Sequence, residues 1–266
     1  MHEIIAALEA NSLVLDLGSG PGSFPDDPAA YRAIRFDLKL PPNPPPNFVQ
    51  GDASRLPFPS ACFDAVLCNH SLEHMPRYKN ALQEIGRVVK RSGAVYIAVP
   101  DASTPQDRLY RWLTEGKDHV NLFVHRRELS KTIEWYTNLS CAGIRTLHTS
   151  FNFLNRRNVK NPAPPRFRLF ALRAEWPLAL LNKAFRLLDR RFRTRFSHYG
   201  WAFYFGNLPE AISTATWNNV CLRCGQAHED AFLMAAGNLH KNWLLGQAYR
   251  CPACTAVNAY WKDESL

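Results

Sequence analysis

Four cysteines near the C-terminus have the spacing of metal ligands. Cys221 and Cys224 form one Cys-x-x-Cys pair, and Cys251 and Cys254 form a second pair after 26 intervening residues. Each pair can present two thiolates to one ion through a tight turn. Because four sulfur ligands leave no open coordination position, the pattern predicts a structural metal site. We expect zinc in preference to rubredoxin-like iron or a redox dithiol.

A glycine-rich turn follows the short apolar run LVLDL near the N-terminus. Gly18, Gly20 and Gly22 lie where a backbone must turn sharply and approach a ligand closely. A dinucleotide fingerprint would need glycine or alanine at its sixth position, opening a long helix, but that position holds Ser23. Pro21 and further prolines leave little room for such a helix, so we do not expect NAD as the cofactor.

Several aspartates lie along the same part of the chain. Asp37 ends the second apolar run, 21 residues after Asp16, and a carboxylate at a strand end can accept both hydroxyl protons of a ribose. Asp52 follows the next run, where it can accept a hydrogen bond from an adenine amino group. Asp64 begins FDAVLCNHSLEH. Any one of them could instead be a turn or cap residue, but their order along the chain favours a shared site.

The elements that would position these residues alternate between strands and helices. Apolar strand-like runs cover 13–17, 33–38, 63–68 and 94–100, and a helical pattern covers 78–90. This alternation predicts an α/β fold with a Rossmann-like, mostly parallel sheet and helices on both faces, its ligand beyond the carboxyl ends of the strands.

The remaining chain divides by composition. The stretch NRRNVKNPAPP at 155–165 is typical of a linker or domain edge. We therefore expect a cofactor-binding domain at 1–155, a basic helical and aromatic segment at 156–210, and a small zinc-ribbon-like module at 211–266.

Composition and targeting signals favour a cytoplasmic protein. Of the 266 residues 46% are hydrophobic, which is ordinary for a packed domain. The N-terminus lacks the pattern of a signal peptide, and no run of about 18 apolar residues could span a bilayer. In a reducing compartment, seven cysteines with four of them paired favour a metal over disulfides.

Much of the net charge of +9 lies in one segment. Residues 166–196 contain nine Lys and Arg side chains and two acids. Apolar residues recur there at steps of three and four, namely Leu178, Leu181, Phe185, Leu188, Phe192 and Phe196. Cations on another face, Lys183, Arg186, Arg190 and Arg193, complete an amphipathic basic helix. Such a helix can pack against the rest of the protein. It can also bind the anionic inner face of a membrane as a peripheral contact, or bind nucleic acid.

Four segments, in their order along the chain, resemble the class I methyltransferases of the methyltransferase type 11 group. They are VLDLGSGPG, GDASRLPFPSACFDAVLCNHSLEHMP, ALQEIGRVVKRSGAVYIAVPD and HVNLF. The resemblance implies S-adenosylmethionine as the cofactor. In this family the glycine loop holds the methionine part, the acid at Asp37 binds the ribose, and the pair at Asp52 borders the adenine. The implied cofactor-binding residues are Asp16, Gly18, Ser19, Gly20, Pro21, Gly22, Asp37, Asp52, Ala53, Asn69 and His70.

The sequence departs from the family pattern at two connections. The helix after the glycine loop is compressed, and LPPNPPPN replaces the helix after Asp37. Because proline lacks the N–H that a helix needs, residues 41–47 should run extended.

Methyl transfer needs a base only when the acceptor must lose a proton. His70 and His119 are the candidates, since imidazole titrates near neutrality and the family places both segments at the mouth of the site. Either histidine could instead be structural. We expect a small-molecule, glycan or lipid-linked acceptor, with RNA, docked on the basic helix and the zinc module, as the alternative.

Overall fold

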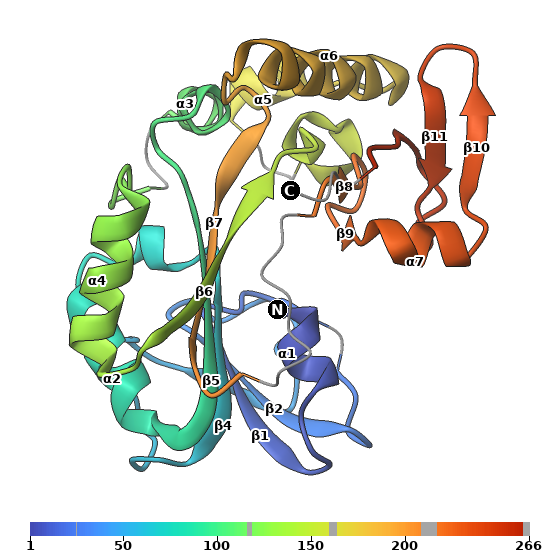
Figure 1. Ribbon diagram of the computed structural model, residues 1–266. Coiled ribbons are helices and arrows are strands. Elements are labelled where there is room, and N and C mark those ends of the chain that lie inside the picture. The colour runs from blue at the N-terminus through green and yellow to red at the C-terminus, as the bar shows by residue number, and fades with distance from the viewer. Residues whose placement is uncertain (25, 116–118, 160–163, 209–216, 263–266) are drawn as a thin grey trace. The chain divides into compact units, whose positions relative to one another are not determined.

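A computed structural model describes residues 1–24, 26–115, 119–159, 164–208 and 217–262 (Figure 1). The chain forms two compact units, each discontinuous along the sequence. The first unit comprises Met1–Asp101, His119–Arg145 and Trp201–Thr214, and the second comprises Ala102–Asp118, Thr146–Gly200 and Ala215–Leu266.

The first unit is built around a seven-stranded sheet. In spatial order its strands are β3 (Phe48–Gln50), β2 (Tyr31–Asp37), β1 (Ser12–Leu17), β4 (Phe63–Asn69), β5 (Val89–Pro100), β7 (His198–Gly206) and β6 (Cys141–His148). The pairs β2–β3, β1–β2, β1–β4 and β4–β5 are parallel. Because these strands are parallel, their carboxyl ends lie at one edge of the sheet, and the predicted site residues lie at that edge.

Helices cover both faces of this sheet, which confirms the predicted Rossmann-like α/β fold class. Helices α2 (Tyr78–Val88) and α4 (Arg126–Thr137) lie on one face and α1 (His2–Ala6) on the other (Figure 1). Helix α2 buries Ala81, Leu82, Ile85 and Val88, the spacing that gives a helix one apolar face.

Glycine at position 86 lets α2 approach α4 closely. A Cβ atom there would lie 2.3 Å from the backbone oxygen of Thr137. Because neither backbone can yield at that distance, a side chain at this position would force the helices apart.

The central strands are continuous apolar runs in the sequence because side chains on both of their faces are buried. Residues on successive positions of β4 are buried because both faces of the sheet are covered. The main cluster includes Leu15, Leu17, Phe36, Val66, Cys68, Leu82, Ile85, Val95, Ile97, Ile133 and Phe203.

The connections after β1 and β2 contain no helix in the residues that the structure describes there. Residues 41–47 form turns and extended backbone, as their prolines predict. The described residues that follow the carboxyl ends of β1 and β2 are therefore turns and extended backbone.

The second unit contains short helices, one long helix and small hairpins. Its elements are α3 (Pro105–Leu113), η2 (Asn152–Leu154), η3 (Arg156–Asn158), α5 (Pro165–Phe170), α6 (Trp176–Phe192), β8 (Asn219–Val220), β9 (Ala227–His228), α7 (Asp230–Ala235), β10 (Leu239–Asn242), β11 (Gly246–Arg250) and β12 (Val257–Ala259). Strands β10, β11 and β12 form an antiparallel sheet, and β8 pairs with β9.

Helix α6 packs on the cysteine-containing hairpins. Ala179 is buried with Leu222, Ala248 and Trp261 in one apolar cluster. Three of the helix cations also contact this region. Lys183 donates to the Leu245 carbonyl, Arg186 donates to the Asn218 side chain, and Arg190 lies over the Trp261 ring.

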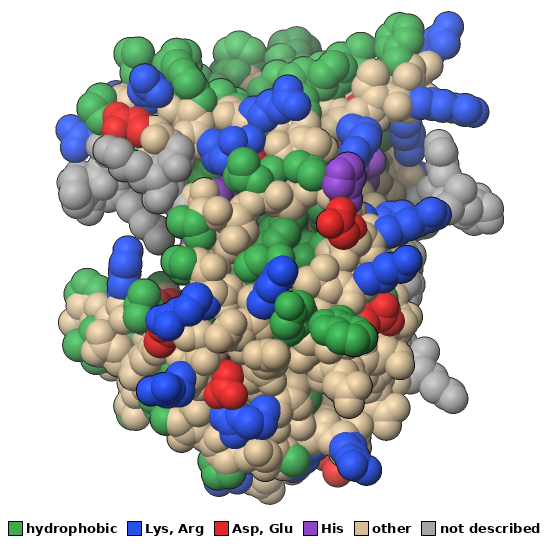
Figure 2. Space-filling model, turned by 90° about the vertical axis from the view of Figure 1, so that its left-hand side faces the viewer, with side chains coloured by type: hydrophobic (Ala, Val, Ile, Leu, Met, Phe, Trp, Pro, Cys, Tyr) green, Lys and Arg blue, Asp and Glu red, His purple; other side chains and the backbone are tan. Residues whose placement is uncertain are grey.

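The predicted apolar stripe of α6 is divided between core and surface. Leu178 is buried and Phe185 packs against Phe151, whereas Leu188 is 36% and Phe192 63% exposed. Hydrophobic side chains, with Lys and Arg beside them, are gathered along the top of the face in Figure 2. In the described residues, no helix is long and apolar enough to cross a bilayer.

Candidate functional site

The glycine loop is held against the neighbouring strand by backbone hydrogen bonds. The amides of Gly18 and Ser19 both donate to the Phe36 carbonyl, and the Gly22 amide donates to the Ser19 carbonyl. Gly18 has a φ of +71°, and a Cβ atom there would lie 2.3 Å from the Cβ of Ser71. Only glycine meets both conditions, so this residue lets the start of the loop contact the segment after β4.

Asp37 joins the end of β2 to the centre of the glycine loop. Its Oδ2 accepts a hydrogen bond from the Gly20 amide at 2.8 Å, and its Oδ1 accepts one from the Lys39 amide at 2.9 Å. A carboxylate has about four lone-pair positions, so two further hydrogen bonds can still be accepted. No atom lies within 4 Å of the place where a Cβ of Gly20 would be, so there is open space on that side of the loop.

Asp16 has a structural role in fixing the loop. Its Oδ2 accepts hydrogen bonds from the Ser23 amide at 2.8 Å and from the Arg35 guanidinium at 2.6 Å. Arg35 is buried as well, and it also donates to the Phe24 carbonyl and to Asp26. The two charges are therefore compensated inside the protein and hold both ends of the loop.

Sequence reasoning did not single out Arg35. A lone arginine within the apolar run AIRFDL was the available signal, because a charge at a buried strand position requires a buried partner.

Asp52 and Ala53 follow β3 and lie beside the end of β2. The Gly51 amide donates to the Asp37 carbonyl at 3.0 Å, which brings the two strand ends together. Asp52 itself is exposed: it accepts from the Ser54 amide and pairs with Arg77 at 2.7 Å. The backbone hydrogen bond from Ser54, helped by Arg77, lowers the pKa of Asp52, so its carboxylate is charged near neutrality.

Asp64 does not belong to this edge. It lies at the start of β4, where it accepts from the Leu13 amide and pairs with Lys90 at 2.6 Å. The strand start faces the opposite edge of a parallel sheet, so the expectation that Asp64 shares the site is wrong and it is a strand cap instead.

Asn69 ends β4 and His70 follows it, at the same edge as Asp37. The His70 amide donates to the Ala98 carbonyl, and this residue has a φ of +51°. Its Nδ1 lies 3.9 Å from the buried Glu73 carboxylate. Burial, followed by the nearby His119 and His74, lowers the pKa of His70 to about 4, so its ring is neutral at pH 7.

His119 joins the same group of side chains. Its ring contacts that of His74 edge-on, with 5.1 Å between the ring centroids. The two predicted histidines are thus gathered with Glu73 and His74.

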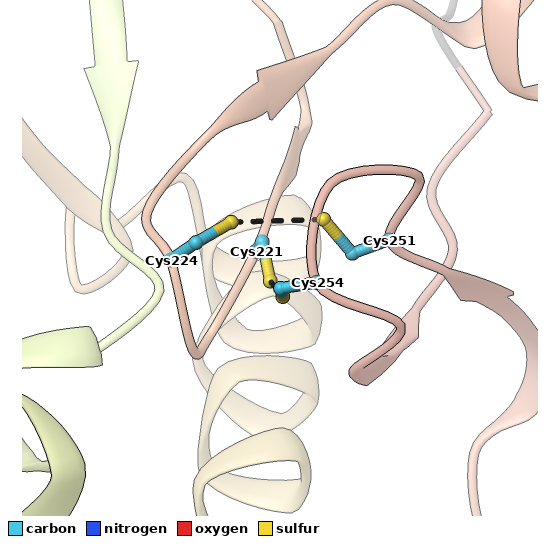
Figure 3. Close-up of side chains that lie close together, drawn as sticks. All are labelled: Cys221, Cys224, Cys251 and Cys254. Atoms are coloured by element: carbon cyan, nitrogen blue, oxygen red, sulfur yellow. Dashed lines mark hydrogen bonds between the residues drawn. The ribbon is translucent and has the colours of Figure 1, made fainter.

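The four predicted cysteines converge in the second unit. Cys221 and Cys254 have their sulfurs 3.5 Å apart, and those of Cys224 and Cys251 are 3.6 Å apart (Figure 3). All four sulfurs lie within 4.8 Å of one another. Tetrahedral zinc with bonds of about 2.3 Å places its sulfurs ~3.8 Å apart, so the cluster has the size of such a site.

Both cysteine pairs sit in the same kind of turn. The Gly225 amide donates to the Cys221 carbonyl and the Thr255 amide donates to the Cys251 carbonyl. Gly225 and Thr255, the residues after each pair, both have positive φ. This repeated geometry turns two thiols of each loop toward a common centre.

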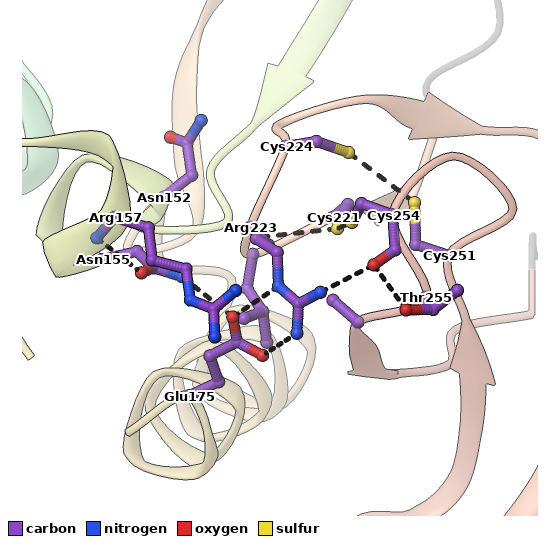
Figure 4. Close-up of polar contacts among 12 residues, drawn as sticks. Asn152, Asn155, Arg157, Glu175, Cys221, Arg223, Cys224, Cys251, Cys254 and Thr255 are labelled. Carbon is purple, nitrogen blue, oxygen red and sulfur yellow. Dashed lines mark hydrogen bonds and ion pairs between the residues drawn. The ribbon is translucent and has the colours of Figure 1, made fainter. Parts of the chain in front are cut away.

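Arg223 connects one of these turns to the start of α6. Its guanidinium makes a bidentate ion pair with Glu175, with nitrogen–oxygen distances of 2.6 and 2.8 Å (Figure 4). It also donates to the Cys254 carbonyl at 2.6 Å. One side chain thus ties both cysteine turns to the helix.

Hydrogen bonding between the thiols shifts the pKa values of Cys221 and Cys224 in opposite directions. A hydrogen bond from Cys224 lowers the pKa of Cys221 to about 4, although burial opposes this shift, and the same contact raises the pKa of Cys224. Burial, followed by the Cys221 charge, raises the pKa of Cys251 to about 11. A cation would be needed to stabilise several thiolates together.

Comparison with known families identifies the segment that builds the first of these sites. Residues 15–97 match the sequence model of the family Methyltransf_11, described as a methyltransferase domain. The matched residues lie within the first unit. They contain the glycine loop, Asp37, Asp52 and the segment from Asn69 to His74, whereas His119 and the four cysteines lie outside the match.

Curated relatives match the same part of the chain. The uncharacterized methyltransferase YcgJ of Bacillus subtilis (strain 168) is 34% identical over 91 residues, which is 33% of this chain and 34% of that protein. Sterol 24-C-methyltransferase ERG6A of Gibberella zeae is 32% identical over 139 residues, which is 50% of this chain and 31% of that protein. The chain therefore spans about a third of the length of these relatives.

Among solved structures, a SAM dependent methyltransferase from Archaeoglobus fulgidus aligns with a TM-score of 0.47 and 18% identity. The alignment covers 74% of this chain and 86% of that one.

Proposed function

We propose that this protein is an S-adenosylmethionine-dependent methyltransferase that acts on a small-molecule, glycan or lipid-linked acceptor. The observation that carries the proposal is the hydrogen bond from the Gly20 amide to Asp37, within the matched methyltransferase domain. This contact places an open glycine turn next to a carboxylate at a strand end, as a nucleoside cofactor requires.

The residues at this edge fit the parts of the cofactor. Asp37 would accept the ribose hydroxyls with its two remaining lone-pair positions, and Gly18, Ser19, Gly20, Pro21 and Gly22 would border the methionine part. Asp52 and Ala53 would border the adenine, and Asn69 and His70 would line the same edge further along. Asp16 would act through the loop that it fixes, because Arg35 and Ser23 already bind its carboxylate.

The cofactor supplies a methyl group on a positively charged sulfur, so the protein's own task is to align the acceptor with it. If the acceptor carries a hydroxyl or ammonium group, a base must remove its proton. His70 and His119 are our candidates, because both lie beside Glu73 and His74, which follow β4 at the edge that carries Asp37. Water would suffice as the base for an acidic acceptor.

Relatives support the class of acceptor. Those matched to this chain include a sterol 24-C-methyltransferase, demethylmenaquinone methyltransferases and a fatty-acid O-methyltransferase. These names describe lipids and small molecules, and we infer the same class here.

A labelling experiment tests the acceptor class. The protein is incubated with S-adenosylmethionine carrying a labelled methyl group and with lipid, small-molecule and RNA fractions of a cell extract. Label in a lipid or small-molecule fraction is expected, and it should disappear with Asp37→Ala. Label confined to the RNA fraction would replace our proposal by the RNA alternative.

We also propose that Cys221, Cys224, Cys251 and Cys254 bind one structural zinc ion. The spacing of their sulfurs, the matching turns and the absence of an open position among four thiolates support this assignment. The ion would stabilise the second unit, because it would join the two cysteine turns to each other.

A third proposal concerns the exposed end of α6, which we propose contacts an anionic membrane surface. Leu188 and Phe192 are exposed there beside Arg191, Arg193 and Arg195. Apolar side chains can enter the headgroup boundary while neighbouring arginines bind anionic lipids, which makes this combination favourable at a membrane.

A further inference from the structure

We propose that Glu73, His74 and His119 form a binding site for a divalent transition-metal ion, separate from the four cysteines. One ligand atom from each of the three side chains lies within 4.8 Å of the other two. The Nε2 of His74 is 3.9 Å from the Glu73 carboxylate. All three residues belong to the first unit, whereas the cysteines belong to the second.

Two imidazoles and one carboxylate are a well-suited donor set. Zinc in catalytic sites is held by three such ligands, and iron(II) is held by two histidines and a carboxylate, in both cases with positions left for other ligands. Glu73 is buried and His74 is 42% exposed, so the ligand atoms lie at a boundary between protein and solvent. An ion here would be anchored from the interior and would keep open positions on its outer side.

The backbone holds the two ligand segments together. The carbonyl of Glu73 accepts hydrogen bonds from the Val120 amide at 2.9 Å and the Asn121 amide at 3.0 Å. The Asn121 side chain donates to the carbonyls of Leu72 and Met75. His119 is thereby fixed next to η1 (Leu72–His74), although 44 residues separate it from His74 in the sequence. Such preorganisation lowers the entropic cost of gathering three ligands.

Charge also favours a cation at this place. The Glu73 carboxylate is only 1% exposed, and its Oε1 lies 3.9 Å from Nδ1 of His70 and 3.9 Å from Nε2 of His74. A buried carboxylate is stabilised strongly by a cation that it coordinates.

The role of the ion rests on the proposed function. Its open positions would hold oxygen atoms of the acceptor and make a bound hydroxyl more acidic. His119 would then be a metal ligand, which leaves His70 as the histidine available to take a proton.

Titration with Co²⁺ tests the site without any activity measurement. The protein as isolated is titrated with Co²⁺, followed by calorimetry and by visible absorption. We expect one equivalent to bind with a d–d spectrum of nitrogen and oxygen ligation and without a thiolate charge-transfer band. His74→Ala and His119→Ala should each weaken this binding by at least about tenfold. The exposed His125→Ala is the matched control and should bind as the wild type does.

Three results would overturn the proposal: no Co²⁺ binding by the wild type, unchanged binding by His74→Ala, or a thiolate band that assigns the ion to the cysteines. His74 is exposed enough that its replacement should leave the fold intact, and a melting curve checks this. Binding of S-adenosylhomocysteine, measured on the same His74→Ala protein, separates failure of this site from failure of the proposed function.

Discussion

Replacing Asp37 by alanine should weaken the binding of S-adenosylhomocysteine by about 1–3 kcal/mol. Two of the lone-pair positions of this carboxylate are used by the Gly20 and Lys39 amides, which leaves two for the ribose hydroxyls. A hydrogen bond to a charged group contributes about 1.5–3 kcal/mol. In the alanine variant, water can occupy the space of the missing carboxylate and recover part of this free energy of binding. The dissociation constant should therefore rise by a factor between about 5 and about 150.

Isothermal titration calorimetry measures this change directly, and two further variants locate its cause. Asp37→Asn keeps an acceptor for the Gly20 amide but loses the charge, so its affinity should lie between those of the wild type and the alanine variant. Asp64→Asn is the matched control, because Asp64 caps the opposite end of the sheet. If Asp37→Ala binds as tightly as the wild type, or if Asp64→Asn loses as much affinity, the assignment of the ribose site is refuted.

Three further predictions follow from particular contacts. Cys251→Ser should lose the one equivalent of zinc that copurifies with the wild type, as metal analysis measures, while calorimetry should show that cofactor binding persists. A wild type with four oxidised cysteines and no metal would contradict the zinc site. Arg35→Met should lower the free energy of unfolding by about 3–5 kcal/mol in urea melts, because it leaves the Asp16 carboxylate buried without its cation; a loss below about 1 kcal/mol would show that this pair is dispensable. Phe192→Ser with Leu188→Ser should abolish flotation with anionic vesicles without lowering thermal stability, whereas tight, salt-sensitive binding of the wild type to RNA would favour nucleic acid instead.

The order of motifs along the sequence was sufficient to predict the sheet and the edge at which Gly18, Asp37 and Asp52 lie. Short apolar runs followed by Gly18, Asp37, Asp52 and Asn69 could only be brought together by parallel strands, and the structure has that arrangement. The cysteines could be predicted for a similar reason, because a Cys-x-x-Cys turn fixes its own geometry locally.

Other features depend on long-range contacts that no local pattern encodes. The pairing of Arg35 with Asp16 and the approach of His119 to Glu73 join segments that are far apart in the sequence. Asp64 is the cap that the sequence left open as an alternative, because it lies at the start of its strand whereas Asp37 ends one.

Helix α6 shows where a periodic pattern is ambiguous. Its apolar stripe is continuous in sequence, but Leu178 belongs to the core and Phe192 to the surface. Periodicity gives the apolar face and does not say how much of its length is covered. The division of the chain at residues 155 and 210 stays a prediction, which limited proteolysis with mass spectrometry can test.

Calorimetry of the wild-type protein with S-adenosylmethionine, S-adenosylhomocysteine and NAD tests the central claim most directly. We predict saturable binding of both sulfur-containing ligands at one site per chain, with NAD far weaker, because the glycine loop opens into turns and prolines rather than a long helix. No heat with either ligand, or tighter binding of NAD, would contradict the assignment of this protein as a methyltransferase.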